Sequence, residues 1–212
     1  MERGTKIIEA KKIMRNNFIG PDELAFIADK MGILVPQTYP IIQFSPKELD
    51  EKSEDYILIL GLTKMKDGLP LTITTLRNYF GVDPKISEPC FYNQDWYVKE
   101  DFVNITLVQK WYLLRKKVFE KSRAIQPEKL LKTDINFPSA ILCAYTFFAY
   151  YFVNMEYLWS YDYIWCNDMD HSGDRIYVGR YIDIEGINKN GFSIHRHLSL
   201  RKCYGAINNI VE

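Results

Sequence analysis

The chain lacks a net charge, closely spaced cysteines and an apolar N-terminal run. Its 27 basic and 27 acidic residues cancel, so no overall field draws it to nucleic acid or to an anionic membrane. Its four cysteines, Cys90, Cys143, Cys166 and Cys203, are far apart, and the polar N-terminal stretch does not resemble a secretory signal. We therefore expect a reduced, cytoplasmic protein, with neither DNA nor a membrane as its partner.

Familiar catalytic signatures are also missing. The sequence contains no P-loop, no glycine fingerprint for dinucleotides, no H-E-x-x-H, no G-x-S-x-G and no kinase motif set. This pattern favours a binding or interaction protein, whose ligand is another protein or a small molecule. No cofactor is expected, although a divalent metal stays open as the alternative.

Charge is absent from the stretch that precedes the C-terminal third. No charged residue occurs between Asp134 and Glu156, and the segment 138–159 reads PSAILCAYTFFAYYFVNMEYLW. A helix that is apolar on nearly every side must be enclosed by other elements. Its length raises the alternative of a membrane span, but its tyrosine, threonine, cysteine and asparagine residues favour a central buried helix.

Helical signals dominate the first eighty residues. Apolar spacing predicts helices near 5–15, 21–31 and 72–80, and the S-P-K-E capping box predicts another at 45–52. DYILILG, at 55–61, predicts a buried strand.

The first two helices could form a helix-turn-helix, but the second is acidic and would be repelled by phosphate. The fold class predicted is α+β, a single domain over 1–212 with a possible helical sub-lobe at 1–81.

The loop at 82–104 is rich in aromatic residues, including Trp96 and Tyr97. Exposed rings of this kind could form the lip of a ligand site, because they stack on sugars and bases. The interpretation we favour is that the rings pack down onto the core, since large aromatic side chains dominate burial.

The C-terminal part predicts an antiparallel β-meander that packs with the central helix over 138–200. RIYVGRYID (175–183) and FSIHRHLSL (192–200) alternate apolar and polar residues, and Asn190-Gly191 is a hairpin-turn signal. The apolar set would face the helix. The other face would be open, with bare Gly179 at its centre, and we predict it as the ligand-binding surface, made by Arg175, Tyr177, Tyr181, His195 and His197.

Two features near this surface need separate interpretations. Arg196 interrupts the apolar set and requires a carboxylate, an edge position or a route to solvent. The turn from Asp168 to Asp174 begins like a calcium-binding EF-hand loop, but Gly179 stands where a bidentate glutamate is required. We interpret this turn as one that its own Asp and Ser side chains cap.

The H-x-H pair supports an alternative function. Histidines two apart on a strand point the same way and can share one metal, so His195, His197 and Asp183 form a possible metal site. The alternative hypothesis is therefore a metal-dependent hydrolase of phosphoester or nucleotide substrates. The first hypothesis stays a non-enzymatic binding protein that uses the polar and aromatic face of the meander.

Overall fold

The computed structural model describes residues 4–185, 189–196 and 199–210. It has helices and two four-stranded mixed sheets, so the α+β class is confirmed. The α-helices are α1 Ile7–Met14, α2 Pro21–Met31, α3 Pro46–Lys52, α4 Ile73–Phe80, α5 Pro127–Leu130 and α6 Ala140–Asn154, and the 3-10 helices are η1 Arg15–Asn17, η2 Asp101–Asn104 and η3 Glu120–Ser122. The strands are β1 Phe18–Ile19, β2 Tyr56–Leu60, β3 Trp111–Arg115, β4 Tyr163–Met169, β5 Arg175–Tyr181, β6 Gly191–His195, β7 Tyr204–Gly205 and β8 Asn209–Ile210.

The N-terminal helices begin and end where local chemistry predicts. At the start of α2 the Gly20 backbone N–H donates to Glu23 at 3.0 Å, and the helix ends at Gly32, whose φ of 62° is left-handed. At the start of α3 the Ser45 N–H donates to Glu48 at 2.8 Å, which completes the predicted capping box. These bonds satisfy backbone groups that a helix end leaves unpaired.

The first sheet joins segments from both ends of the chain. Its strand order is β1-β2-β3-β8, with β1 parallel to β2 and the other pairs antiparallel. All five residues of β2 are buried, as the apolar run at 55–61 predicts. The predicted helical part of the chain thus also supplies two strands, and the sheet that contains them is completed near the C-terminus.

The second sheet contains the meander. Its order is β6-β5-β4-β7, and the β4–β5 and β5–β6 pairs are antiparallel neighbours in chain order. Strand β7 adds a parallel edge that the sequence did not predict. Strand β6 ends at His195, so the strand predicted to run on to Leu200 is too long; after it Arg196 pairs with Asp170 instead of continuing the ladder.

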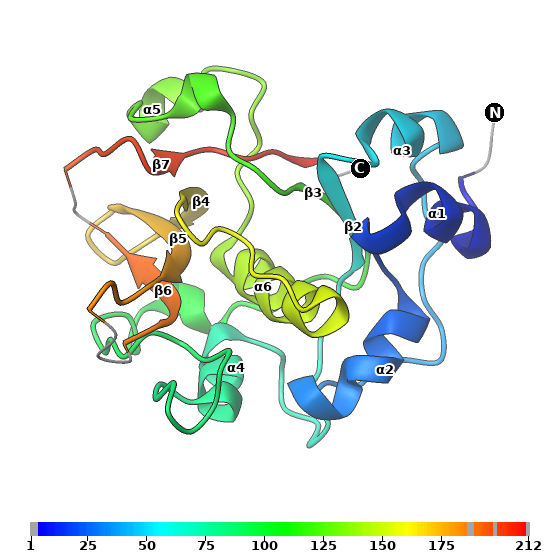
Figure 1. The fold of residues 1–212 in the computed structure, drawn as a ribbon, viewed down its shortest axis with the longest axis horizontal. Coiled ribbons are helices and arrows are strands. Elements are labelled where there is room, and N and C mark those ends of the chain that lie inside the picture. The colour runs from blue at the N-terminus through cyan, green and yellow to red at the C-terminus, as the bar shows by residue number, and fades with distance from the viewer. Residues whose placement is uncertain (1–3, 186–188, 197–198, 211–212) are drawn as a thin grey trace.

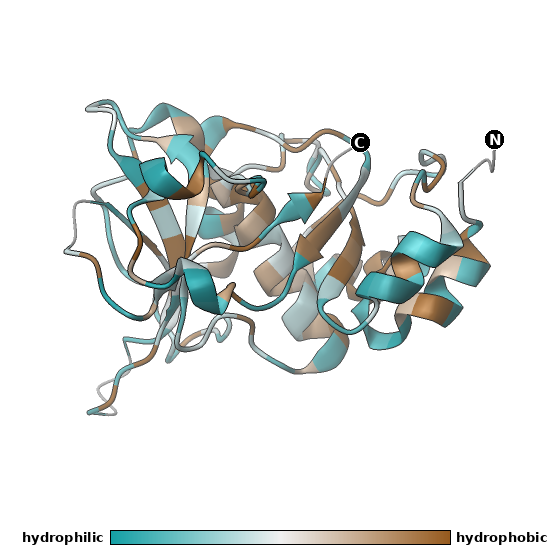
Figure 2. Cartoon of the chain, turned by 90° about the horizontal axis from the view of Figure 1, so that it is seen from above, coloured by the Kyte–Doolittle hydropathy of each residue, from teal (hydrophilic) through white to brown (hydrophobic). Residues whose placement is uncertain are grey.

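Helix α6 lies between the two sheets (Figure 1). Eleven of its fifteen residues are buried, and the Tyr145 hydroxyl donates to the Leu60 carbonyl of β2 at 2.9 Å. The helix is shorter than the predicted segment, because Met155, the residue after Asn154, has a left-handed φ of 56° that ends it. Figure 2 shows apolar residues concentrated on α6 and the strands beside it, with hydrophilic residues on the outer helices. No described helix has both the length and the apolar character to span a bilayer.

The aromatic loop packs onto the core, as the favoured interpretation predicted. Phe91, Tyr97 and Phe102 are all buried, and Phe91 lies 5.1 Å from the ring of Phe148 in α6. Trp96 remains partly exposed, and its indole N–H donates to the Ile194 carbonyl of β6 at 3.0 Å. The loop therefore fixes the edge of the second sheet.

Candidate functional site

The predicted open face of the meander is covered at Tyr177 by other parts of the chain. Tyr177 is only 1% exposed and belongs to a second buried cluster with Trp165 and Tyr204, whose rings lie 5.1 and 4.8 Å from its own. Leu130 and Phe137, from the segment between β3 and α6, complete the cover. The expectation of an open face is wrong at Tyr177, because sequence alternation cannot show that a distant segment covers the second side of a sheet.

The predicted gap at Gly179 is also filled. A Cβ atom built on Gly179 would lie 2.3 Å from the carbonyl oxygen of Asp162 and 3.0 Å from the ring of Tyr163. Glycine is therefore required here by the close approach of the chain that leads into β4. It does not leave room for a ligand.

The structure brings Tyr177 and His195 together, with their ring centroids 5.5 Å apart and the rings stacked, whereas Arg175, Tyr181 and Asp183 have other partners. The Arg175 guanidinium donates to the Cys166 carbonyl at 3.0 Å and lies over the ring of Phe137. Tyr181 is half-buried, with its ring 4.7 Å from that of Tyr92. The backbone N–H of Asp183 donates to Asn190 at 2.8 Å, and its carboxylate accepts from the Glu185 N–H at 3.0 Å. Asp183 thus shapes the connection between β5 and β6.

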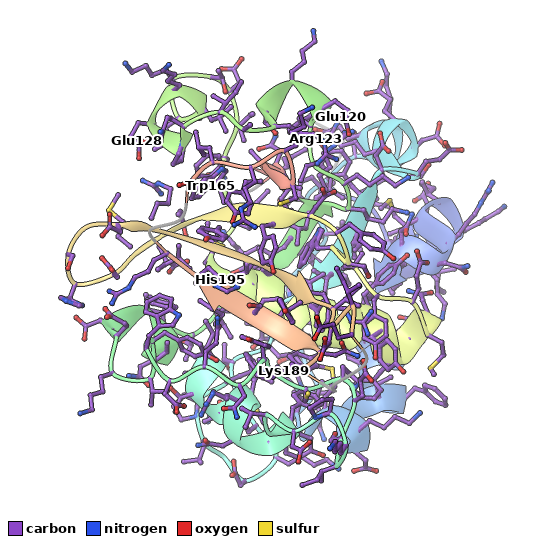
Figure 3. The ribbon with its side chains drawn as sticks, turned by 60° about the vertical axis from the view of Figure 1, so that its left-hand side comes forward. Glu120, Arg123, Glu128, Trp165, Lys189 and His195 are labelled. Carbon is purple, nitrogen blue, oxygen red and sulfur yellow. The ribbon has the colours of Figure 1, made fainter. Side chains whose placement is uncertain are left out.

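His195, labelled on β6 in Figure 3, uses both of its ring nitrogens within the protein. The Gln94 side-chain amide lies 3.2 Å from Nδ1 and the Ser193 hydroxyl lies 2.5 Å from Nε2. Because an amide nitrogen is a donor, Nδ1 accepts and the proton is on Nε2. Burial lowers the pKa of His195 to about 4, so the ring is neutral near pH 7.

The proposed metal site is tested only in part by this arrangement. His197 lies outside the described residues. Within residues 4–185, 189–196 and 199–210, no group of three His, Cys, Asp or Glu side chains could hold a metal ion. To bind a metal, His195 would have to give up its bond to Gln94 or to Ser193. The H-x-H hypothesis stays a prediction, and no described contact favours it.

An apolar groove lies on the outer side of the segment that covers the meander. Its volume is about 760 Å³, and its apolar lining comes from Phe119, Ile125, Leu130 and Ile135. The last three also pack in the second buried cluster, so the floor of the groove is continuous with the cover over Tyr177. We call this site the η3–α5 groove.

Charged side chains line the rim of the η3–α5 groove. Glu120 pairs with Arg123 at 2.8 Å, and Lys121, Lys129 and Asp134 are exposed. Arg123 also pairs with Asp162 at 2.6 Å, at the start of the meander. Figure 3 shows Glu120 and Arg123 beside each other, on the same side of the molecule as Trp165. The Arg123–Asp162 ion pair thus ties the covering segment to the start of the meander.

A second, smaller pocket lies where the aromatic loop meets the Asp168–Asp174 turn. Its volume is about 360 Å³, and we call it the Arg196 pocket; it is lined by Trp96, Lys99, Glu100, Asp101, Met169, Asp170, His171 and Arg196. Arg196 forms ion pairs with Asp170 and, at 3.7 Å, with Glu100, and its guanidinium lies 4.5 Å from the centre of the Trp96 ring. Of the three alternatives predicted for Arg196, the structure supplies a carboxylate, and the side chain is also 25% exposed to solvent.

The Asp168–Asp174 turn forms one side of this pocket and places His171 in it. The Asp170 carboxylate accepts from the backbone N–H groups of Ser172 and Asp174 at 2.9 and 2.8 Å, so the turn caps itself as predicted. His171, at its tip, donates its backbone N–H to Glu100 at 2.9 Å, and its Nδ1 lies 2.7 Å from the same carboxylate. Glu100 is only 7% exposed, whereas the His171 side chain is 69% exposed.

Comparisons with known proteins add no assignment to either site. No family model matches the chain, and neither the curated proteins nor the solved structures contain a match. Function must therefore be argued from the two sites themselves.

Sequence reasoning singled out Trp96, Arg196 and the Asp168–Asp174 turn, which line the Arg196 pocket, but it missed Glu100 and the residues of the groove. Glu100 carries no motif, and only the unpaired charge of Arg196 indicated that some carboxylate must lie nearby. The groove residues belong to a segment with short, irregular elements, for which period and turn signals give little guidance.

Proposed function

We propose that this chain is a binding protein that captures a partner protein through the η3–α5 groove. The observation that carries the proposal is the concave apolar lining of Phe119, Ile125, Leu130 and Ile135, surrounded by charged side chains. Protein interfaces have this anatomy, with a dry apolar centre and a polar rim. A pocket of this kind accepts one or two apolar anchor side chains from the partner.

The groove is supported from below, which favours binding without large rearrangement. Leu130 is 5% exposed and packs in the same cluster as Trp165 and Tyr177 of the meander. Arg123 ties the segment to Asp162 at 2.6 Å. A preformed site loses less conformational entropy on binding than a flexible one. Tyr177, from the face predicted by the sequence, thus packs in the cluster that supports the proposed surface.

Photo-crosslinking tests this proposal. A benzoylphenylalanine at position 129, on the groove rim, should give a specific adduct in the cells that make the protein. The same group at position 128, which is exposed but does not line the groove, is the matched control. Adducts from position 129 should disappear when Ile125→Glu places a charge in the groove and should persist with Leu131→Glu, an exposed position outside it.

Two results would contradict the proposal. One is an identical adduct pattern from positions 128 and 129. The other is an adduct from position 129 that survives Ile125→Glu in a protein whose near-ultraviolet circular dichroism is unchanged. Either result would show that the apolar lining is not what the partner contacts.

A further inference from the structure

The geometry of the Arg196 pocket points to a second activity, separate from the groove. We propose that His171 acts there as a general base, with Glu100 as its positioning residue, and that it hydrolyses small carboxylic esters. The inference does not depend on the binding function proposed above. It rests on the contacts between the two side chains, on their unequal burial and on the pocket they share.

Glu100 fixes both the direction and the tautomer of the His171 ring. An ionised carboxylate is only an acceptor, so Nδ1 of His171 must donate the 2.7 Å bond. The second carboxylate oxygen accepts the His171 backbone N–H at 2.9 Å, which prevents the pair from moving apart independently. In the neutral ring the lone pair is then on Nε2. A buried carboxylate that orients a histidine in this way is the base and orienter part of a catalytic triad.

Charged side chains of both signs line the pocket, with Lys99 and Arg196 beside the carboxylates of Glu100, Asp101 and Asp170. Arg196 lies 3.7 Å from Glu100 and its side chain is 25% exposed, and Lys99 lines the same pocket from an exposed position. Because Arg196 is already paired with Asp170 and Glu100, we assign to exposed Lys99 the role of stabilising the negative oxygen that forms on the carbonyl during attack. The Trp96 ring supplies an apolar wall. With a volume of about 360 Å³, the pocket is at the small end of ligand sites, which suits a small acyl group.

The reaction needs only water and ester. Nε2 of His171 removes a proton from water as the water oxygen bonds to the carbonyl carbon, and the carbonyl electron pair moves to oxygen. The tetrahedral intermediate then collapses, the carbon–oxygen bond to the alcohol breaks, and the leaving oxygen takes the proton back from Nε2. The products are a carboxylic acid and an alcohol, and the histidine returns to its neutral form.

The test measures hydrolysis of p-nitrophenyl acetate by the full chain, with the buffer rate subtracted. General base catalysis contributes about a hundredfold or more in rate, so His171→Gln should lower the rate by about that factor. Glu100→Gln should lower it about tenfold or more, because the ring loses its fixed tautomer. Glu128→Gln is the matched control for Glu100→Gln: Glu128 is exposed and does not line the pocket, so this variant should leave the rate unchanged.

Comparison with Glu100→Gln decides between the proposal and the slow reaction of any exposed imidazole. Equal rates for wild type and a folded Glu100→Gln variant would overturn the proposal, as would equal rates for wild type and His171→Gln. Nitrogen-15 NMR of the His171 ring in the wild type gives a second measurement that needs no variant. In the neutral ring, a proton on Nδ1 supports the pair, whereas a proton on Nε2 overturns it. Neither result bears on the crosslinking outcome at the groove.

Discussion

At the scale of single residues, Arg196 shows how one charge within an apolar alternation organises its surroundings. The sequence pattern predicted that it needs a partner, and the structure supplies Asp170, Glu100 and the Trp96 ring. The Asp170 side chain is fully buried. A buried ion pair contributes little net stability, but removing one partner leaves an uncompensated charge that is costly.

This imbalance gives the first prediction on stability. Arg196→Leu should lower the free energy of unfolding by about 3–5 kcal/mol, measured by urea denaturation. The double variant Arg196→Leu/Asp170→Asn should recover part of that loss, because the side chain at position 170 then no longer carries the buried charge that Arg196 balanced. A double variant as unstable as the sum of the two single variants would show that the pair is not coupled.

His195 gives a prediction on pH. Its pKa is lowered to about 4 by burial, whereas an unfolded histidine has a pKa near 6.5. Between these values the unfolded chain binds a proton that the folded chain does not, so stability falls as pH decreases from about 6.5 to about 4. The full effect is up to about 3 kcal/mol, at 1.36 kcal/mol per pKa unit.

The measurement compares wild type with His195→Gln, which cannot titrate, by urea denaturation at several pH values. The difference in the free energy of unfolding between wild type and His195→Gln should become smaller as the pH falls from 6.5 to 4. The comparison is needed because burial raises the pKa of Asp168. This raised pKa increases the stability of both proteins as the pH falls, which is opposite to the effect of His195. Parallel curves for the two proteins would show that His195 is not buried in its neutral form.

The residues whose positions the sequence could not predict share a physical cause. Tyr177 alternates with Ile176 and Val178 and was therefore predicted to be exposed, yet Leu130 and Phe137 cover it. The sequence predicted an open gap at Gly179, yet the Asp162 carbonyl occupies the space beside it. Alternation along a strand shows which residues share a face of the sheet. It does not show which other segments pack against each face.

At the scale of elements, local signals predicted the helices well, whereas the shortest strands had none. Ser45, Thr72 and Ser139 each accept a backbone N–H at a helix start, and such caps can be recognised from neighbouring residues alone. Strands β1, β7 and β8 have two residues each. Two residues carry no period, so their pairing is determined by tertiary contacts.

Helix α6 also has a cap that comes from far along the chain. The Asp168 carboxylate of β4 accepts the Ala140 N–H at 2.6 Å, beside the local cap from Ser139. Asp168→Ala should destabilise the protein by about 1–2 kcal/mol, the range for loss of a helix cap. Thermal unfolding would measure the loss, and Asn167→Ala, at an exposed neighbour on the same strand, is the control. Equal melting temperatures for the two variants would show that Ser139 alone is sufficient.

At the scale of the whole molecule, the last described residues connect the two sheets. Strand β7 pairs with β4 and strand β8 pairs with β3, and between them Ala206 and Ile207 are completely buried. Ala206 belongs to the cluster that covers the meander, while Ile207 belongs to the main core around α6. A segment with so little intrinsic strand signal therefore holds both halves together, which the sequence pattern did not indicate.

If the chain unfolds as one domain, damage at this connection must weaken both sheets. Ile207→Ala removes a buried side chain and should cost about 2–5 kcal/mol. We expect hydrogen exchange to quicken to a similar extent in peptides from β2 and from β5, because each sheet opens only with the other. Ile210→Ala, half-buried at the edge of the first sheet, is the control and should have a smaller effect. Faster exchange in β2 alone would show instead that the first sheet opens as an independent unit.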